Sequence, residues 1–276
     1  MTRMGATKPF APRNLLYLLV LIAVVAIFNS PIIWTFKISI EEADLIFKEP
    51  LALLFNPTIA SYRVLFQEFL GYFLNSFLAA SGSTLLSIII GFPTAYSIAR
   101  FRTGGENLSF WILSLRFIPP VAFLIPIYIW ISTIGLLDNI FGLIPVYLIL
   151  NLPLSIWFLR SFIEEIPVEN EEAALIDGCS RLEAMLRITL PLSRPAIAAV
   201  SVLAFIASWN EYLCALVLTY TRARTWPVAL AQFIGLYRVS YGELAAAGII
   251  GMLPTIVLAI VMRNHLVRGM TLGVLK

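Results

Sequence analysis

Six stretches of the chain are apolar over a length that can cross a lipid bilayer, and they constrain the fold more than any other feature. The hydrocarbon core of a bilayer requires about 20 mainly apolar residues per helix. We therefore predict an all-α integral membrane protein with six transmembrane helices, folded as a single transmembrane domain over residues 1–276. The predicted spans are 15–36, 72–99, 108–132, 140–159, 196–220 and 244–262.

The amino-acid composition supports this class. Hydrophobic residues make up 60% of the chain and charged residues 13%, with a mean hydropathy of +0.90. Soluble domains carry about 25% charged residues, so a soluble fold could not cover this much apolar surface. The net charge is only +3, and the basic residues are scattered singly, without the clustered stripe that nucleic-acid binding requires. We therefore predict a bilayer environment and no nucleic-acid partner.

Residues that commonly build catalytic or metal sites are sparse. Cys179 lies in a charged segment and Cys214 in an apolar one, which predicts neither a disulfide framework nor a metal site. The single histidine, His265, has no carboxylate or nucleophile patterned beside it. We therefore predict a chain that is not itself an enzyme and binds no metal.

The distribution of basic residues predicts the orientation in the membrane. The first span is longer than the apolar region of a signal peptide and lacks a small-x-small cleavage site, so we expect a retained helix. With the N-terminus inside, twelve of the 19 Lys and Arg residues lie on the inner side, six lie outside and Arg116 lies within a span. Because cytoplasmic loops retain positive charge, both termini and the loop 164–195 are predicted to be cytoplasmic.

Prolines inside or near several spans predict bent helices. Each proline removes a backbone donor, and a helix bundle tolerates this when neighbouring groups or water satisfy the freed carbonyl. The prolines are Pro93, Pro119, Pro120, Pro126, Pro145, Pro153 and Pro254.

The loop 164–195 is unusually charged for a segment between two spans, and its first half predicts a short helix. Pro167 suits the first turn of a helix, and Gly178 suits the left-handed position that ends one. Between them, two adjacent alanines give a smooth, close-packing face. Acidic side chains crowd the beginning of this helix, where the positive end of the helix dipole favours them. They are Glu169, Glu171 and Glu172.

The second half of the loop predicts another helix that begins at once. Ser180 and Glu183 fit the S-x-x-E capping box, in which each residue satisfies a backbone donor of the other. The helix is predicted to stop at Leu190-Pro191, so the loop forms two short helices that meet at a glycine elbow. The residues expected on one face of the second helix are Leu182, Met185, Leu186 and Thr189.

The spacing of seven residues in this loop is similar to the EAA loop of permease subunits from binding-protein-dependent ABC importers. They are Glu172, Ala173, Ala174, Gly178, Ile188, Leu190 and Pro191. In that family, the loop forms coupling helices that lie in a groove of the cytoplasmic ATPase. The resemblance implies a type I ABC importer fold and an ATPase-coupling role for a wider set. That set is Glu171, Glu172, Ala173, Ala174, Asp177, Gly178, Leu182, Met185, Ile188, Leu190 and Pro191.

Further segments resemble the carbohydrate-uptake branch of the family, in particular the smaller permease of maltose-type heterodimers. The segment 95–101 (AYSIARF) is similar to the end of the family's second helix, and Asn75-Ser76 to its start. The segment 209–212 (WNEY) resembles a recurrent pattern of that branch. The tail 269–276 also resembles the family's C-terminus, although its ending Val274-Leu275-Lys276 departs from the usual Ala-Val-Lys-Gly.

Polar groups at membrane depth are candidates for a translocation pathway. Glu211 lies about 15 residues into the predicted fifth span, where an ionisable group is costly and usually faces a cavity or a partner. Together with its neighbours Trp209, Asn210 and Tyr212, it either lines the pathway or makes a hydrogen bond that fixes helix packing. Arg116 either pairs with Glu211 or extends its side chain towards the cytoplasmic surface.

These patterns predict a permease subunit of an ATP-driven importer for a sugar, working by alternating access in the inner membrane of a prokaryote. The sequence has no G-x-x-x-x-G-K-[ST] phosphate loop, so ATP and Mg²⁺ are expected on a partner. The resemblance implies two ATPase subunits, a second homologous permease and an extracytoplasmic solute-binding protein.

Other functions stay open from the sequence. The cargo of such an importer can be an amino acid, a polyamine or phosphate instead of a sugar. An ion-coupled secondary transporter would be favoured by paired buried acids or inverted repeats, and the sequence shows one buried acid and no repeat. An intramembrane enzyme would need a nucleophile and base or metal ligands at membrane depth.

Overall fold

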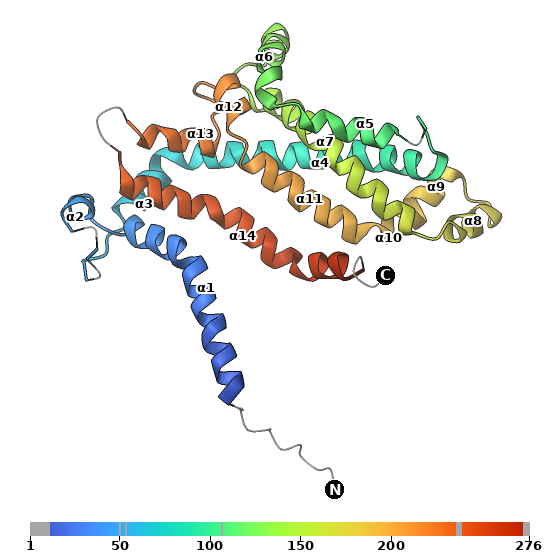
Figure 1. Ribbon diagram of the computed structural model, residues 1–276. Helices are drawn as coiled ribbons and strands as arrows, with labels where there is room; N and C mark the ends of the chain where they lie inside the picture. Colours follow the sequence, from blue (N-terminus) through green and yellow to red (C-terminus); the bar gives the residue numbers. More distant parts are fainter. Residues whose placement is uncertain (1–11, 50, 53, 106, 236–238, 273–276) are drawn as a thin grey trace.

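A computed structural model describes residues 12–49, 51–52, 54–105, 107–235 and 239–272. The regular elements in these ranges are helices, with one isolated antiparallel bridge between Ile234 and Val239 (Figure 1). The long helices are α1 (Pro12–Ser39), α4 (Leu70–Phe101), α7 (Ile140–Glu165), α11 (Arg194–Trp209) and α14 (Tyr241–Leu272).

Shorter helices connect or cap the long ones. They are α2 (Ala43–Lys48), α3 (Ala60–Val64), α5 (Leu108–Ser114), α6 (Leu124–Thr133), α8 (Glu169–Ile176), α9 (Arg181–Ala184), α10 (Leu190–Leu192), α12 (Leu213–Leu218) and α13 (Trp226–Leu230). Five single turns complete the set, namely the π-helical η1 (Leu65–Phe69) and η4 (Met185–Thr189) and the 3₁₀-helical η2 (Leu115–Phe117), η3 (Pro120–Phe123) and η5 (Ala231–Phe233).

The all-helical prediction is confirmed, and the described residues contain four to six helices that can cross a membrane. Four are continuous, and two bent pairs bring the number to six if each pair counts as one span. The continuous segments are Tyr17–Ser39, Ala60–Phe101, Ile140–Glu165 and Tyr241–Met262. They agree with four of the predicted spans.

The predicted third span, 108–132, is not one helix. The segments Leu108–Phe117 and Pro120–Thr133 meet at an angle of 92°. Ile118 and Pro119 between them are extended, because a proline removes a backbone donor and disfavours helical geometry in the residue before it. Two consecutive prolines therefore break the helix, whereas α7 continues through the isolated Pro145 and Pro153.

The predicted fifth span, 196–220, is also interrupted. Helix α11 ends at Trp209, and α12 begins only at Leu213. A second bend of 74° separates α11 from the segment Arg181–Leu192 that precedes it. Helix α11 therefore has a break at each end.

Helices α4 and α7 pack side by side along their length, and α11 lies against both (Figure 1). Small residues of α4 permit this close approach, as is common between membrane helices. A Cβ on Gly82 would lie 2.8 Å from the Cδ1 atom of Ile144 in α7. A buried polar ladder joins the three helices, because the Asn151 side-chain amide donates to the Ser208 hydroxyl at 2.6 Å and the Ser83 hydroxyl lies 2.9 Å from the same atom.

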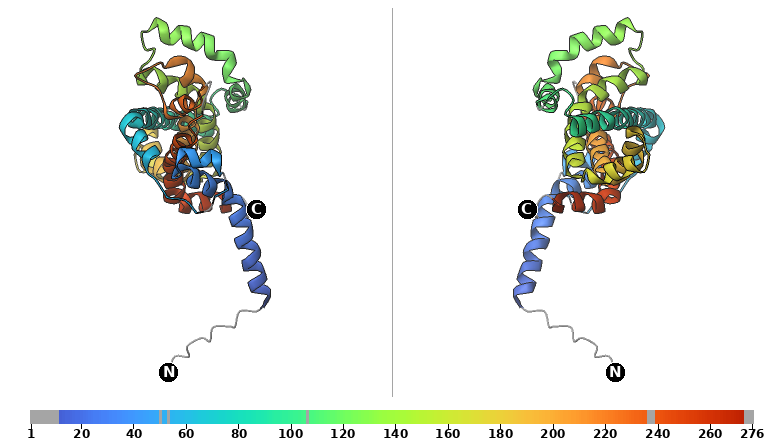
Figure 2. Two further views of the ribbon diagram at one scale, coloured as in Figure 1. Left: turned by 90° about the vertical axis from the view of Figure 1, so that its left-hand side faces the viewer. Right: turned by 90° about the vertical axis from the view of Figure 1, so that its right-hand side faces the viewer.

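Helix α1 extends away from this bundle in all three views (Figures 1 and 2). None of its most apolar segment is buried. Its C-terminal end packs against α14, and the Ser39 hydroxyl lies 2.8 Å from the Tyr62 hydroxyl of α3. The bundle formed by α4, α7, α11 and α14 is therefore the part of the fold that positions the candidate sites.

Candidate functional site

The loop between α7 and α11 forms an elbow, defined here as residues 167–192, at one end of the bundle (Figure 1). Its first arm is α8, and Gly178 follows with a φ of +90°, a left-handed conformation that glycine adopts without strain. The second arm begins at the capping box. The Ser180 hydroxyl accepts from the Glu183 amide at 3.3 Å, and the Ser180 amide donates to the Glu183 carboxylate at 2.9 Å. The two short helices predicted from the sequence are therefore present.

The second arm differs from the prediction in where it ends. It does not stop at Leu190-Pro191 but runs through η4 and α10 to Leu192, and the bend follows at Ser193. Because Pro191 cannot donate a backbone hydrogen bond, the regular ladder is interrupted, and the preceding turn widens to the π form.

The second arm also divides its apolar residues between two faces instead of presenting one. Met185 and Thr189 are buried against the bundle, whereas Leu182 and Leu186 are exposed. The expectation of a single face is therefore wrong. Met185 and Thr189 are four residues apart and share one side of the helix, and Leu182 and Leu186 are four residues apart and share another. The second arm therefore has an anchoring face, which is buried, and a free face, which is exposed.

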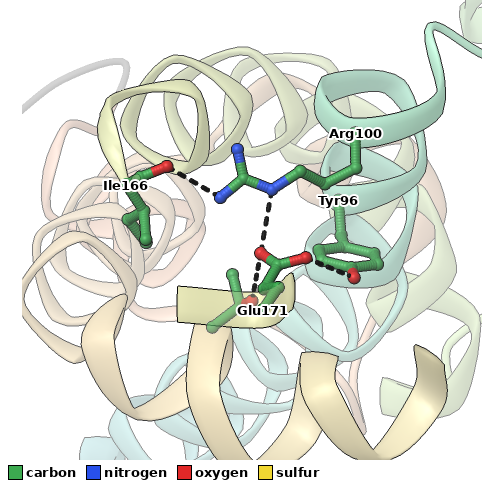
Figure 3. Close-up of polar contacts among 5 residues, drawn as sticks. Tyr96, Arg100, Ile166 and Glu171 are labelled. Carbon is green, nitrogen blue, oxygen red and sulfur yellow. Dashed lines mark hydrogen bonds and ion pairs between the residues drawn. The ribbon is translucent and has the colours of Figure 1, made fainter. Parts of the chain in front are cut away.

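Glu171 lies at the centre of the anchoring contacts (Figure 3). Its side chain comes from the first arm and is buried, with only 6% of the residue exposed. The Arg100 Nε atom and the Thr189 hydroxyl donate to Oε1 at 2.8 and 2.7 Å, and the Tyr96 hydroxyl donates to Oε2 at 2.8 Å. One carboxylate thus joins α4 to both arms of the elbow.

The electrostatics of this cluster favour the ionised carboxylate. Burial raises the pKa of Glu171, but the hydrogen bonds from Thr189, Tyr96 and Arg100 and the charge of Arg100 together lower the pKa below its usual value of 4.5. The side chains of Arg100 and Glu171 are each 7% exposed. Removal of either partner would leave a buried charge uncompensated, which typically costs about 3–5 kcal/mol.

Arg100 makes a second contact that ties a further helix into the cluster. Its Nη2 atom donates to the carbonyl oxygen of Ile166, the residue that caps the end of α7, at 2.9 Å (Figure 3). The planar guanidinium group can bind two acceptors in fixed directions, which a lysine cannot reproduce. In addition, the guanidinium of Arg181 in the second arm lies 5.1 Å from the ring centre of Phe101 at the end of α4.

The other predicted coupling residues fall into two groups. Residues that face the bundle and are buried or half-buried are Ala174, Met185, Ile188, Leu190 and Pro191. Residues that are exposed are Glu172, Ala173, Asp177, Gly178 and Leu182. The exposed group adjoins Ile176, which is 86% exposed.

Sequence reasoning missed Tyr96 and Arg100 as partners of the elbow. Both lie in the segment 95–101, which had been noted for its family resemblance, yet about 70 residues separate them from Glu171. Their spacing of four residues on one helix, with one aromatic hydroxyl and one cation, was the available signal. Nothing in the sequence indicated which acid they meet.

A second candidate site is a cavity of about 560 Å³ at the two helix breaks. Residues of the η2–η3 bend, α7 and the α11–α12 break line it, and most of them are apolar. The polar ones are Arg116, Tyr147, Asn151, Ser208 and Glu211. In the part of the chain that the structure describes, no group of three or more His, Cys, Asp or Glu could hold a metal ion.

The charged residues of the cavity are held by backbone groups. Glu211 does not lie inside a continuous helix as predicted but caps α12, accepting from the amides of Cys214 and Ala215 at 2.9 and 3.1 Å. Arg116 donates to the carbonyl oxygen of Leu150 at 2.7 Å. The two side chains share the cavity, and among the described residues no ion pair joins them.

The neighbours of Glu211 lie in different surroundings. Trp209 is buried and donates from its indole nitrogen to the carbonyl oxygen of Gly251 at 3.0 Å, so it packs α11 against α14. Asn210 donates to the Ile206 carbonyl at the end of α11, and Tyr212 is 40% exposed. The four residues 209–212 therefore do not all face the same cavity.

A third polar cluster lies just before α7. The carboxylate of Asp138 accepts hydrogen bonds from the backbone amides of four consecutive residues, Tyr220 to Ala223, at 2.9–3.1 Å. The Thr221 hydroxyl adds another bond at 2.9 Å. Burial raises the pKa of Asp138, but these bonds together hold it far below its usual range. The side-chain amide of Asn75 donates hydrogen bonds to two carbonyl oxygens of the same loop, those of Arg222 and Arg224.

Comparisons with known proteins agree with this architecture. Residues 83–272, more than half of the chain, match the family described as "Binding-protein-dependent transport system inner membrane component". The chain belongs to this permease family. The match begins within α4 and covers the elbow and the cavity, so the family resemblance expected from the sequence is confirmed.

Individual relatives cover almost the whole chain. The trehalose/maltose transport system permease protein MalG of Thermococcus litoralis is 34% identical over 264 residues, covering 93% of this chain and 94% of that protein. A probable ABC transporter permease, y4oR of Sinorhizobium fredii, is 33% identical and covers 96% of each chain. A crystal structure of a bacterial ABC transporter that imports the acidic polysaccharide alginate aligns with a TM-score of 0.73 and 25% identity, covering 94% of this chain and 99% of that chain.

Some residues that the sequence analysis singled out lie beyond the structural description. The last four residues of the tail, 273–276, are outside the described residues, and the side chains of 263–272 are also not described. His265 and the altered ending Val274-Leu275-Lys276 are therefore given no structural account.

Proposed function

We propose that this permease imports a carbohydrate across the inner membrane, driven by a separate ATPase. Its relatives include permeases named for trehalose and maltose, for trehalose and for sulfoquinovosyl glycerol, at 32–34% identity over 89–93% of this chain. The observation that carries the proposal is this near full-length similarity, together with an elbow whose free face can receive a partner.

The proposed ATPase contact is the free face of the elbow. It consists of exposed residues at the tip of both arms, where large apolar side chains rarely face solvent without a partner. The buried residues of the elbow hold this face in place through the Glu171 cluster. The exposed residues that form the free face are Glu172, Ala173, Ile176 and Asp177, together with Leu182 and Leu186 of the second arm.

The proposed orientation places the elbow and both termini in the cytoplasm, with six spans when each bent segment counts as one. Positive charge on the elbow side supports it, since cytoplasmic loops retain Lys and Arg. The proposed partners are two ATPase subunits that bind ATP and Mg²⁺, a second related permease and a solute-binding protein outside. Asp138 and its loop then lie at the outer end of α7.

The cavity between the two helix breaks is the proposed part of the translocation pathway. Its mixture of apolar walls and a few polar groups is typical of small-molecule sites. Arg116 and Glu211 offer a donor and an acceptor there, and breaks in membrane helices are tolerated where they line such a cavity. Alternating access would open this cavity to each side in turn.

Copurification tests the ATPase contact. Ile176→Asp places a charge on the free face, and we expect the ATPase to be lost from the purified complex. The matched control is Leu54→Asp, because Leu54 is 95% exposed and lies far from the elbow in the sequence. A complex of normal stoichiometry with Ile176→Asp would show that the free face does not bind the ATPase.

Transport tests the cargo and the pathway. The assembled importer, with its binding protein, is reconstituted in vesicles and offered labelled trehalose, maltose, amino acids, polyamines and phosphate. We expect uptake of a sugar, and uptake of one of the other solutes alone would contradict a carbohydrate function. Glu211→Gln is expected to abolish uptake while the complex with the ATPase survives. Unchanged uptake would remove Glu211 from the pathway.

A further inference from the structure

The Glu211 carboxylate in the cavity lies near two sets of hydrogen-bond donors and uses one of them. It accepts from the backbone amides of Cys214 and Ala215 at 2.9 and 3.1 Å. The Tyr147 hydroxyl on α7 lies near both this carboxylate and the hydroxyl of Thr225, the residue just before α13. A second set of donors is therefore within reach of Glu211 and is not bound to it.

The two hydroxyls of the second set are buried and unpaired. Tyr147 and Thr225 are 1% and 2% exposed, and their hydroxyl oxygens have no hydrogen-bond partner among the described residues. A buried hydroxyl without a partner is unfavourable, because it has lost its bonds to water without replacement. The surroundings offer no substitute, since Tyr147 packs in an apolar cluster with Leu143, Val146 and Leu218.

The hydroxyl of Thr225 is not committed to its own helix. A threonine that precedes the first turn of a helix commonly accepts from an amide of that turn. Thr225 makes no such bond to the described residues of α13. The amide of Trp226 donates instead to the Ser76 hydroxyl of α4 at 2.7 Å, and Pro227 has no amide to offer. The Thr225 hydroxyl is therefore available to donate to the oxygen of Tyr147.

The chain at Glu211 is built in a way that permits a change of partner. Residues 210–212 are not helical and separate α11 from α12. A carboxylate that moved to Tyr147 would release the amides of Cys214 and Ala215 and would alter the wall of the cavity at this break. Packed interiors change between discrete arrangements more readily than they deform continuously, and a second set of donors supplies such an arrangement.

We infer that Tyr147 and Thr225 are positioning residues for Glu211 in a second state of the transporter. In that state, the Thr225 hydroxyl donates to the Tyr147 oxygen, the Tyr147 hydroxyl donates to the Glu211 carboxylate, and the amides of α12 are released. The inference rests on the proposed function, because the second state is a step of alternating access through the cavity. It accounts for two buried hydroxyls that stay unpaired beside an acceptor in the present conformation.

Structures of the complete importer in two states test the inference directly. The complex of both permeases, the ATPase and the binding protein is determined by cryo-electron microscopy without nucleotide and after trapping with ATP and vanadate. We expect Glu211 on the amides of Cys214 and Ala215 in one state and within about 3.2 Å of the Tyr147 oxygen in the other. A carboxylate that keeps the same partners in both states would overturn the inference. A complex that fails to assemble would instead contradict the proposed function.

Variants separate positioning from simple stability. Tyr147→Phe and Thr225→Val remove the hydroxyls and keep the shapes of the side chains. In the state in which Glu211 binds α12, we expect the thermal stability of the complex to be unchanged or slightly higher, since the hydroxyls are unpaired there. The maximal rate of uptake of labelled trehalose or maltose should fall about tenfold for Tyr147→Phe, which loses a bond to a charged group, and less for Thr225→Val. KM should change little. Thr225→Ser should restore the rate.

The matched control is Thr84→Val, because the Thr84 hydroxyl on α4 is also buried and has no partner among the described residues. It should leave both stability and uptake near wild type. If Tyr147→Phe and Thr225→Val also transport at the wild-type rate, their hydroxyls do not position Glu211. A marked loss of stability in the state in which Glu211 binds α12 would overturn the inference as well, because the hydroxyls would then already be bonded in that state.

Discussion

The two ends of α7 carry carboxylates that are both rich in hydrogen bonds but are built differently. Asp138, just before α7, receives its backbone donors from four consecutive residues of one loop. Glu171, just after α7, receives its donors from side chains of α4 and of η4. The first cluster shapes a single loop, whereas the second joins separate helices.

This difference affects what each end can do. Backbone amides in one loop leave little freedom, so the Asp138 end is suited to hold a fixed shape. Long side chains such as those of Arg100 and Tyr96 can keep their bonds while the segments they join move together. About 39 Å of helix separates the two ends, since α7 has 26 residues that rise 1.5 Å each.

The largest effect on stability is expected from the substitution Glu171→Ala. It leaves the buried Arg100 without its counter-ion, and we expect a loss of about 3–5 kcal/mol in the free energy of unfolding. Denaturant titration of the subunit in detergent micelles measures it. The double variant Glu171→Leu/Arg100→Met is expected to recover stability to within about 1 kcal/mol of wild type but not the coupling of transport to ATP. Full recovery of both would show that the cluster only stabilises the fold.

A smaller effect is expected from Asp138→Ala at the other end. The loss of several charge-assisted bonds, together with alanine at a φ of +53°, should cost about 2 kcal/mol. Because the cluster holds one loop, trypsin should cleave faster after Arg222 and Arg224. Asp138→Asn tolerates the left-handed backbone and serves as the control, with an intermediate effect. Unchanged cleavage in Asp138→Ala would mean that Asn75 alone holds the loop.

The response to acid should distinguish the two clusters. Both carboxylates have lowered pKa values, so each stabilises the fold above its usual pKa and loses this contribution as the pH falls through its pKa in the folded protein. The pKa of Asp138 is held further down, so its loop should stay protected from proteolysis at a pH where the Glu171 cluster has weakened. The stability difference between wild type and Glu171→Gln should narrow as the pH is lowered below 4.5. A difference that grows as the pH falls from 7 towards 4.5, and stays constant below it, would mean instead that the pKa of Glu171 is raised in the folded protein.

The smallest effect on stability is expected from a substitution at the exposed tip of the elbow. Ser180→Ala removes the cap of the second arm and should cost about 1 kcal/mol or less. Hydrogen exchange of the amides from Arg181 to Ala184 measures the local loosening, and Ser180→Thr should restore protection. A loss as large as that of Glu171→Ala would mean that the free face also stabilises the bundle.

Local features of the elbow could be predicted from the sequence, and long-range ones could not. Gly178 and the Ser180–Glu183 capping box act within a few residues, and both have the expected geometry. The burial of Glu171 in place of Glu172 depends on where α4 ends in space, which no local pattern contains. The division of the second arm into two faces was missed for the same reason, because it also depends on where the other helices lie in space.

The spans show a similar limit. Hydropathy identified the apolar stretches, because the bilayer requirement depends on composition alone. It could not separate a continuous helix from a broken one, since Ile118 at the first break is as apolar as its helical neighbours. The paired prolines were the signal for the bend after η2, whereas the break at Asn210 and Glu211 depends on the carboxylate capping α12.

Helix α1 also has a consequence for how the subunit is made. Its most apolar segment is not buried against the rest of the bundle, and its C-terminal end packs against α14, which is translated much later. During synthesis, α1 can enter the bilayer while α14 does not yet exist. The nascent chain is then tethered to the membrane from α1 onward, and α14 docks against the C-terminal end of α1 only after α14 itself has been inserted.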